Sequence, residues 1–165
     1  MTKLLVTVLA IAVLATGAAW AGPGETAARP PSSSADVVKV VPVPARLAAA
    51  AGERVEFKLN LHIQQKWHLY AHGDTSYIGI DLLPAEDFPL TELGIVYPEG
   101  HLGTIIGDPV IMLEGDEVIA VTGAVRSDLP AGDHALTLAL TVQACDDKSC
   151  LRPSDVPVIL ILTVK

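Results

Sequence analysis

The clearest pattern in the sequence is an alternation of apolar and polar residues in two segments. Apolar side chains stand at every second position from Val55 to Ile63, and the pattern returns from Leu136 to Val142. Alternation of this length is typical of β-strands that bury one face. The segment Val156 to Val164 is apolar at both parities. We expect it to be a strand that is covered on both sides or that lies at a sheet edge.

Shorter apolar runs, separated by turn-forming residues, predict further strands. Beyond the N-terminal segment no long stretch keeps a helical period, and the Ala-rich run from Arg46 to Ala51 is too short for a helix. Many short strands joined by turns predict an all-β fold, an immunoglobulin-like antiparallel β-sandwich, with a barrel as the alternative. The shorter strands are expected at Val37 to Val43, Trp67 to Ala71, Ile78 to Leu83, Leu93 to Tyr97, Val110 to Leu113 and Val118 to Val125.

The N-terminus has the features of a secretory signal. Lys3 precedes an apolar run from Leu4 to Ala15, and Ala19-Trp20-Ala21 fits a small-residue cleavage site. The apolar run is shorter than the roughly 20 residues that a membrane-spanning helix needs. We therefore expect residues 1–21 to be a cleaved signal peptide that directs the chain to the periplasm, with no membrane insertion afterwards.

The segment after the signal predicts a leader. Gly22 to Asp36 is rich in Gly, Pro, Ser and Ala and has almost no large apolar residue, so it lacks the side chains to build a core. We expect residues 22–36 to be a flexible leader and residues 37–165 to be one folded domain.

Composition narrows the classes of function. The chain has 11 Lys and Arg against 19 Asp and Glu, a formal net charge of −8. This balance argues against binding to nucleic acid or to anionic membrane surfaces, because both depend on clustered basic residues. The sequence has no Walker loop, no G-x-S-x-G or H-E-x-x-H motif and no pair of catalytic carboxylates. We expect neither a hydrolase nor a nucleotide enzyme, and no cofactor.

The two cysteines of the chain lie five positions apart. Cys145 and Cys150 flank Asp146 to Ser149, a polar segment of β-hairpin loop length. Cysteines at the ends of such a loop can face each other and pair, and a disulfide persists in an exported protein. By strand parity, Cys145 falls on the face opposite to the apolar stripe from Leu136 to Leu140. We therefore expect its sulfur to be near the surface and accessible.

The spacing of the cysteines leaves two interpretations open. As an inert staple, the pair closes so short a ring that the lost chain entropy stabilises the fold by only about 2 kcal/mol. As a redox pair, a short and exposed disulfide is of the kind that is readily reduced. The pair does not have the C-x-x-C spacing of thioredoxin-like enzymes.

The cysteine segment resembles a known family. The run from Gln143 to Pro153, followed by Val156-Pro157-Val158, is similar to the cysteine segment of the N-terminal periplasmic domain of the DsbD-type thiol:disulfide interchange proteins. Trp67-His68 and Tyr97-Pro98-Glu99-Gly100 also resemble that domain, so the similarity extends over residues 37–165. The resemblance implies an immunoglobulin-like domain that receives electrons from a membrane thiol reductase. It implies that the domain passes them to periplasmic thioredoxin-fold proteins, such as disulfide isomerases or the reductases of cytochrome c maturation.

The resemblance also implies roles for individual residues. Cys150 would form the mixed disulfide with partners, and Cys145 would resolve it. A cap loop covers the pair in the family, and its counterpart here would be Glu99 to Asp108. The best-known members have one more residue between the cysteines, and an aromatic residue in the cap where this chain has His101 and Leu102.

A further departure concerns the length of the sequence. The DsbD proteins continue into a multi-span membrane domain and a thioredoxin domain, whereas this sequence ends at Lys165. We therefore expect a separate carrier, active as a monomer in thiol:disulfide interchange of the protein-disulfide reductase type. The alternative is a non-catalytic β-sandwich module that binds a partner or copper and has a structural disulfide.

Charges in the cysteine loop suggest how its reactivity is controlled. Asp146 and Asp147 disfavour a nearby thiolate, and Lys148 offsets them in part. One hypothesis is that the reduced pair reacts slowly until a partner desolvates or displaces these charges. The other is that Asp146 to Ser149 is simply a soluble turn.

Histidines and aromatic residues offer other candidate sites. His62, His68 and His72 share one strand parity, and Cys145 or Met112 could complete a copper site. Gln64 to Lys66 interrupts that strand, however, and histidines on strands commonly face solvent. Trp67 could form a partner-docking surface with Tyr70 and Tyr77. For Trp67 itself we expect a place in the core.

Overall fold

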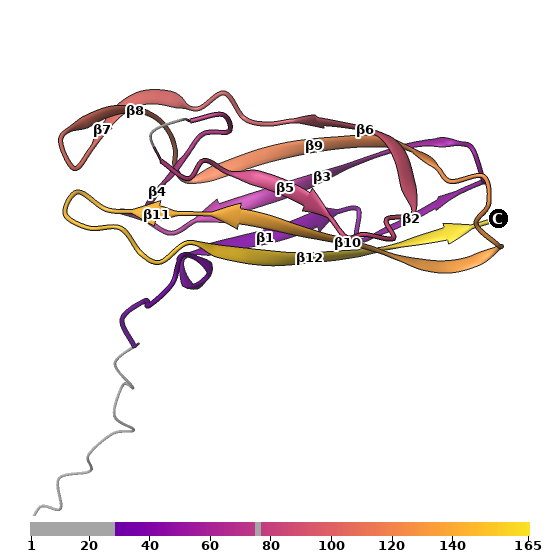
Figure 1. Cartoon of the computed structure of the whole chain (residues 1–165). Helices are drawn as coiled ribbons and strands as arrows, with labels where there is room; N and C mark the ends of the chain where they lie inside the picture. The colour runs from indigo at the N-terminus through magenta and orange to yellow at the C-terminus, as the bar shows by residue number, and fades with distance from the viewer. Residues whose placement is uncertain (1–28, 75–76) are drawn as a thin grey trace, which may run out of the picture.

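The computed structural model describes residues 29–74 and 77–165 (Figure 1). The predicted signal peptide at residues 1–21 and the first part of the leader, residues 22–28, lie outside the described residues. The described chain consists of strands and one short 3-10 turn, so the all-β prediction is confirmed. Within this part of the chain no helix has the length and hydropathy to span a membrane.

Two four-stranded sheets form the body of the molecule. The first has the order β1-β3-β9-β6, and every neighbouring pair in it is antiparallel. Its strands are β1 (Val38–Val43), β3 (Arg54–Ile63), β9 (Asp116–Val125) and β6 (Leu90–Val96). The second has the order β2-β12-β10-β5. Its strands are β2 (Arg46–Ala49), β12 (Ser154–Val164), β10 (Gly132–Val142) and β5 (Asp81–Pro84).

The two sheets pack face to face, as Figure 1 shows. The side chains between them form a mainly aliphatic core. Along β3, β9 and β10 the buried and less buried positions alternate, because successive side chains of a strand point to opposite faces. Core residues with no exposed surface include Leu59, Leu61, Ile119, Val121, Leu136, Leu140 and Leu162. The predicted immunoglobulin-like sandwich is therefore confirmed, and the barrel alternative is not observed.

A third, smaller sheet extends the sandwich at one end. Its order is β11-β4-β8-β7, and all its neighbouring pairs are antiparallel. Its strands are β11 (Ala144–Cys145), β4 (His68–Tyr70), β8 (Asp108–Leu113) and β7 (His101–Ile105). This sheet contains the first cysteine, and Figure 1 shows the loop that follows β11 at the same end of the molecule as the β7–β8 hairpin.

Two strands differ from what the sequence led us to expect. The Arg46 to Ala51 stretch, for which the sequence excluded a helix and predicted no strand, contains β2, which pairs in parallel with the end of β12. A partner so distant in sequence leaves no local signal. β12 was expected to be covered on both faces or to lie at an edge, but it lies between β2 and β10 and buries one face. On its other face Ile159 is 60% exposed. The apolar pattern was misleading because isoleucine is favoured in strands whether its face is open or buried.

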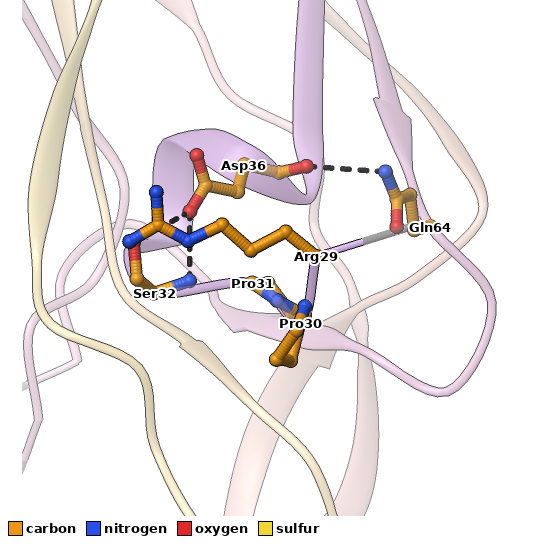
Figure 2. Close-up of a pocket in the computed structure, with 6 residues that line it drawn as sticks. All are labelled: Arg29, Pro30, Pro31, Ser32, Asp36 and Gln64. Atoms are coloured by element: carbon orange, nitrogen blue, oxygen red, sulfur yellow. Dashed lines mark hydrogen bonds between the residues drawn. The ribbon is translucent and has the colours of Figure 1, made fainter. Parts of the chain in front are cut away.

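The end of the predicted leader is attached to the domain. Ser34–Asp36 forms a 3-10 turn, and the Asp36 carboxylate accepts backbone hydrogen bonds from Ser32 at 2.8 Å and Ser33 at 2.9 Å. These donors lower the pKa of Asp36 below its usual value. Figure 2 shows the Gln64 side chain reaching the carbonyl oxygen of Asp36, with Arg29 beside the same hollow. Ser33 also forms a bridge with Arg152, so the segment follows the sandwich surface to the cysteine end.

Candidate functional site

The two cysteines form a disulfide across a tight hairpin. Cys145 and Cys150 face each other as an antiparallel bridge, with their Cα atoms 4.0 Å apart. The prediction that the loop places them opposite each other is confirmed. The backbone N–H of Asp146 donates to the carbonyl oxygen of Ser149 at 2.9 Å, which closes the loop between them.

Asp146 organises this loop with its side chain. One carboxylate oxygen accepts hydrogen bonds from the backbone N–H of Lys148 at 3.0 Å and of Ser149 at 2.8 Å, and from the Ser149 hydroxyl at 3.2 Å. The two backbone donors are the main cause of the lowered pKa of Asp146. The residue therefore shapes the turn as well as placing a negative charge beside the cysteines.

The two sulfur-bearing residues differ sharply in exposure. Cys150 is exposed, whereas Cys145 has no exposed surface. The expectation that Cys145 lies near the surface is wrong, because the strand is interrupted at Gln143 and the chain moves from β10 to pair with β4. The alternation of side chains along β10 therefore cannot be extended past Gln143 to predict the direction of the Cys145 side chain. A partner approaching from solvent meets Cys150 first.

Tyr70 lies directly beside the disulfide. Its hydroxyl oxygen is 3.3 Å from Sγ of Cys145 and 3.8 Å from Sγ of Cys150. Burial, followed by the negative charges of Tyr77, Asp74 and Asp108 when they are ionised, raises the pKa of Tyr70 to about 12. The phenol therefore keeps its proton at physiological pH and can donate a hydrogen bond to a sulfur.

A second tyrosine lies against the first. The rings of Tyr70 and Tyr77 stack with their centroids 4.4 Å apart, and the Tyr77 hydroxyl donates a hydrogen bond to the Asp108 carboxylate. That hydrogen bond is the main cause of the raised pKa of Tyr77. Trp67 is 5% exposed and packs in the main core, as expected. Tyr70 is fully buried, so the three aromatic residues do not form one exposed docking surface.

The β7–β8 hairpin occupies the place expected for a cap. Glu99 to Asp108 was expected to be a loop, but β7 lies within it and pairs with β8. Ile105 and Val110 pack with Cys145 and Tyr70 in a small cluster separate from the main core. The hairpin therefore covers the buried cysteine with aliphatic side chains.

The three histidines considered for a copper site each lie beside a different carboxylate. His62 contacts Asp116, His68 lies 3.1 Å from Glu114, and His72 lies 3.7 Å from Asp81. In residues 29–74 and 77–165 no group of three or more His, Cys, Asp and Glu side chains could hold a metal ion. The copper site considered from the sequence is therefore not assembled by this part of the chain.

One histidine does lie beside the disulfide. His68 is the direct cross-strand partner of Cys145. Its Nδ1 atom is buried near one oxygen of the Glu114 carboxylate, and Nε2 of His101 lies 3.6 Å from the other oxygen. A single carboxylate thus stands between two imidazoles on the sheet that carries the first cysteine.

The fold of the domain has a counterpart among solved structures. No family model and no curated protein matches the chain. The N-terminal periplasmic domain of ScsB from Proteus mirabilis matches over 76% of this chain with a TM-score of 0.58, at 13% sequence identity. The two share a fold. This chain spans 46% of the length of the solved ScsB chain, and at this identity the similarity concerns the fold alone.

Two further solved structures match with lower scores. The N-terminal domain of DsbD from Neisseria meningitidis, in the reduced form, has 16% identity over 68% of this chain and 78% of its own, with a TM-score of 0.41. A family 123 glycoside hydrolase from Clostridium perfringens has 8% identity over 78% of this chain and 27% of its own, with a TM-score of 0.47. The similarity of fold rests on the ScsB domain, which has the higher TM-score. The resemblance predicted from the sequence is therefore confirmed as a similarity of fold.

Proposed function

We propose that this chain is a periplasmic thiol:disulfide exchange carrier that works through Cys145 and Cys150. It would take electrons from a membrane thiol reductase and deliver them to thioredoxin-fold proteins. The observation that carries the proposal is the asymmetry of the pair, in which an exposed Cys150 is bonded to a Cys145 that is buried beside the Tyr70 hydroxyl. The ScsB-like fold supports the same assignment.

The difference in exposure between the cysteines supports an order for the steps of reduction. A thiolate of the reductant attacks Sγ of Cys150, the disulfide bond breaks, and Cys145 leaves as a thiolate that then takes a proton. The second thiolate of the reductant then attacks the reductant sulfur that is bonded to Cys150. This releases the Cys150 thiolate, which takes another proton. The reductant dithiol becomes a disulfide, and the carrier gains two electrons and two protons. Delivery to an oxidised partner runs these steps in reverse.

Tyr70 assists the leaving sulfur in this scheme. The thiolate of Cys145 forms where the phenol lies 3.3 Å away, so the hydroxyl donates a hydrogen bond to the developing negative charge. A hydrogen bond to a charged group contributes about 1.5–3 kcal/mol. The burial that raises the pKa of Tyr70 also keeps the phenol protonated and available as a donor.

The experiment that tests the proposal traps the mixed disulfide. A thioredoxin-fold protein with its nucleophilic cysteine activated by thionitrobenzoate is mixed with Cys145→Ser, which retains the exposed thiol, and release of the coloured anion is followed. The matched control is Cys150→Ser, which retains the buried thiol. We expect rapid release and a covalent complex with Cys145→Ser alone.

Two outcomes would overturn the assignment. Equal rates for the two variants would show that the exposed sulfur has no special role. No complex with either variant would leave the disulfide as a structural element of a binding module.

A further inference from the structure

Ser34 is a buried polar residue at the start of the domain. It lies in the 3-10 turn before β1 and has no exposed surface, although its side chain is small and polar. Its hydroxyl donates to the carbonyl oxygen of Arg152 at 2.9 Å and accepts the backbone N–H of Ala144, also at 2.9 Å. The Ser34 N–H donates to the same carbonyl of Arg152 at 3.0 Å.

These hydrogen bonds join the two arms of the cysteine hairpin. Ala144 directly precedes Cys145, and Arg152 follows Cys150 by two residues. The Leu151 N–H also donates to the Ala144 carbonyl oxygen at 2.8 Å, so the base of the hairpin is held directly and through Ser34. A serine hydroxyl has one donor and can accept, and here both capacities are used across the hairpin.

We propose that Ser34 is a positioning residue that sets the reduction potential of the Cys145–Cys150 pair. By tying Ala144 to Arg152, its hydroxyl keeps the two sulfurs close after reduction, which raises the effective concentration of one thiol at the other. Formation of the Cys145–Cys150 disulfide is then favoured, so the reduction potential of the pair is more negative than it would be without the Ser34 hydrogen bonds. The inference rests on the proposed function, since the potential matters biologically only for a pair that exchanges.

The test compares the disulfide equilibrium of three variants in a dithiothreitol buffer series. Ser34→Ala removes the clamp, and Ser34→Thr keeps the hydroxyl. The control is Ser154→Ala, because the hydroxyl of the half-buried Ser154 also donates to the Arg152 carbonyl, at 3.3 Å. We expect Ser34→Ala to shift the equilibrium toward the dithiol by about tenfold, or about 30 mV for a two-electron couple. Ser34→Thr and Ser154→Ala should stay near wild type.

A purely structural role would give a different result. If Ser34 only fastened the N-terminal segment, Ser34→Ala would destabilise the oxidised and reduced proteins equally and leave the equilibrium at the wild-type value. That result would overturn the inference. Under the proposal, the loss of stability is larger in the oxidised protein than in the reduced one.

A measurement on the wild-type chain covers the case in which Ser34→Ala does not fold. Hydrogen exchange at the Ala144 N–H should be faster in the reduced protein than in the oxidised one, because the clamp is weaker when the ring is open. Equal exchange in both states would contradict the proposal. A wild-type potential outside the range of exchange proteins would count against the carrier but would leave the difference between Ser34→Ala and wild type measurable.

Discussion

Tyr70 is buried among apolar side chains, and its hydroxyl lies beside the sulfurs that would exchange. We expect Tyr70→Phe to slow thiol:disulfide exchange by a factor of about 10 to 100, because it removes one hydrogen bond to a charged sulfur. Stopped-flow reduction by a thioredoxin-fold protein measures the rate. The control is Tyr97→Phe, since the Tyr97 hydroxyl donates to Asp81 at 3.0 Å and accepts from the Leu82 N–H at 2.9 Å, away from the cysteines. Equal rates for Tyr70→Phe and wild type would contradict the role assigned to the hydroxyl.

The same residue predicts a loss of stability at alkaline pH. Because the pKa of Tyr70 rises from 10.0 to about 12 on folding, the native state holds this proton more tightly than the unfolded chain does. The stabilisation is fully present below pH 10 and is lost as the pH rises toward 12, up to roughly 3 kcal/mol. Urea unfolding at about pH 8 and about pH 11 should show a smaller fall for Tyr70→Phe than for wild type. An identical fall in both proteins would be evidence against the raised pKa.

Sequence and structure agree on the cysteines and differ on their surroundings. A hairpin-length loop was enough to predict that Cys145 and Cys150 face each other. Tyr70 could not be placed because β4 reaches β11 through a pairing of residues far apart in the chain. The role of Ser34 could not be predicted, because the composition of its segment is that of a flexible leader. Only the long-range hydrogen bond to Arg152 shows that Ser34 belongs to the domain.

At the scale of elements, the cysteine hairpin is shaped by the same residue that places charge beside it. Replacing Asp146 and Asp147 together by Asn keeps an oxygen that can accept the hydrogen bonds of Lys148 and Ser149, but it removes both charges. We expect the reduced variant to react with iodoacetamide about two to five times faster, because exposed negative charges disfavour the thiolate modestly in a high dielectric.

A matched control separates local charge from net charge. Glu56→Gln with Glu86→Gln also removes two negative charges, at exposed positions outside the cysteine hairpin. This variant should alkylate at the wild-type rate. If the two double variants behave alike, or if neither differs from wild type, the acidic residues of the loop do not restrain the thiols.

The elements were predicted most accurately where a long alternating pattern coincides with a strand. The central strands β3 and β10 match the periodic segments from Val55 and from Leu136. The short strands β2, β7 and β11 were missed, because each owes its conformation to a distant neighbour. Of these strands, β11 contains Cys145 and β7 supplies Ile105, which packs against it, so the sequence predicted the sandwich well and the environment of the site poorly.

On the scale of the whole molecule, the disulfide and the main core are separate. The core between the two large sheets does not include either cysteine, and the short ring adds only about 2 kcal/mol by chain entropy. We expect the reduced protein and the Cys145→Ser, Cys150→Ser double variant to keep the native far-UV circular dichroism and a cooperative thermal transition. Unfolding on reduction would mean that the bond is a structural staple, since a carrier has to stay folded in both states.

The measurement that tests the central claim most directly is the reduction potential of the wild-type pair. It is obtained by titration in glutathione and dithiothreitol buffers, with the fraction of free thiols scored by a mass-shifting label. For a carrier between a membrane reductase and thioredoxin-fold partners, we predict a midpoint between about −180 and −270 mV, the span of the exchange proteins. A disulfide that stays intact below about −300 mV, or a pair that never oxidises, would contradict the carrier and leave the binding module.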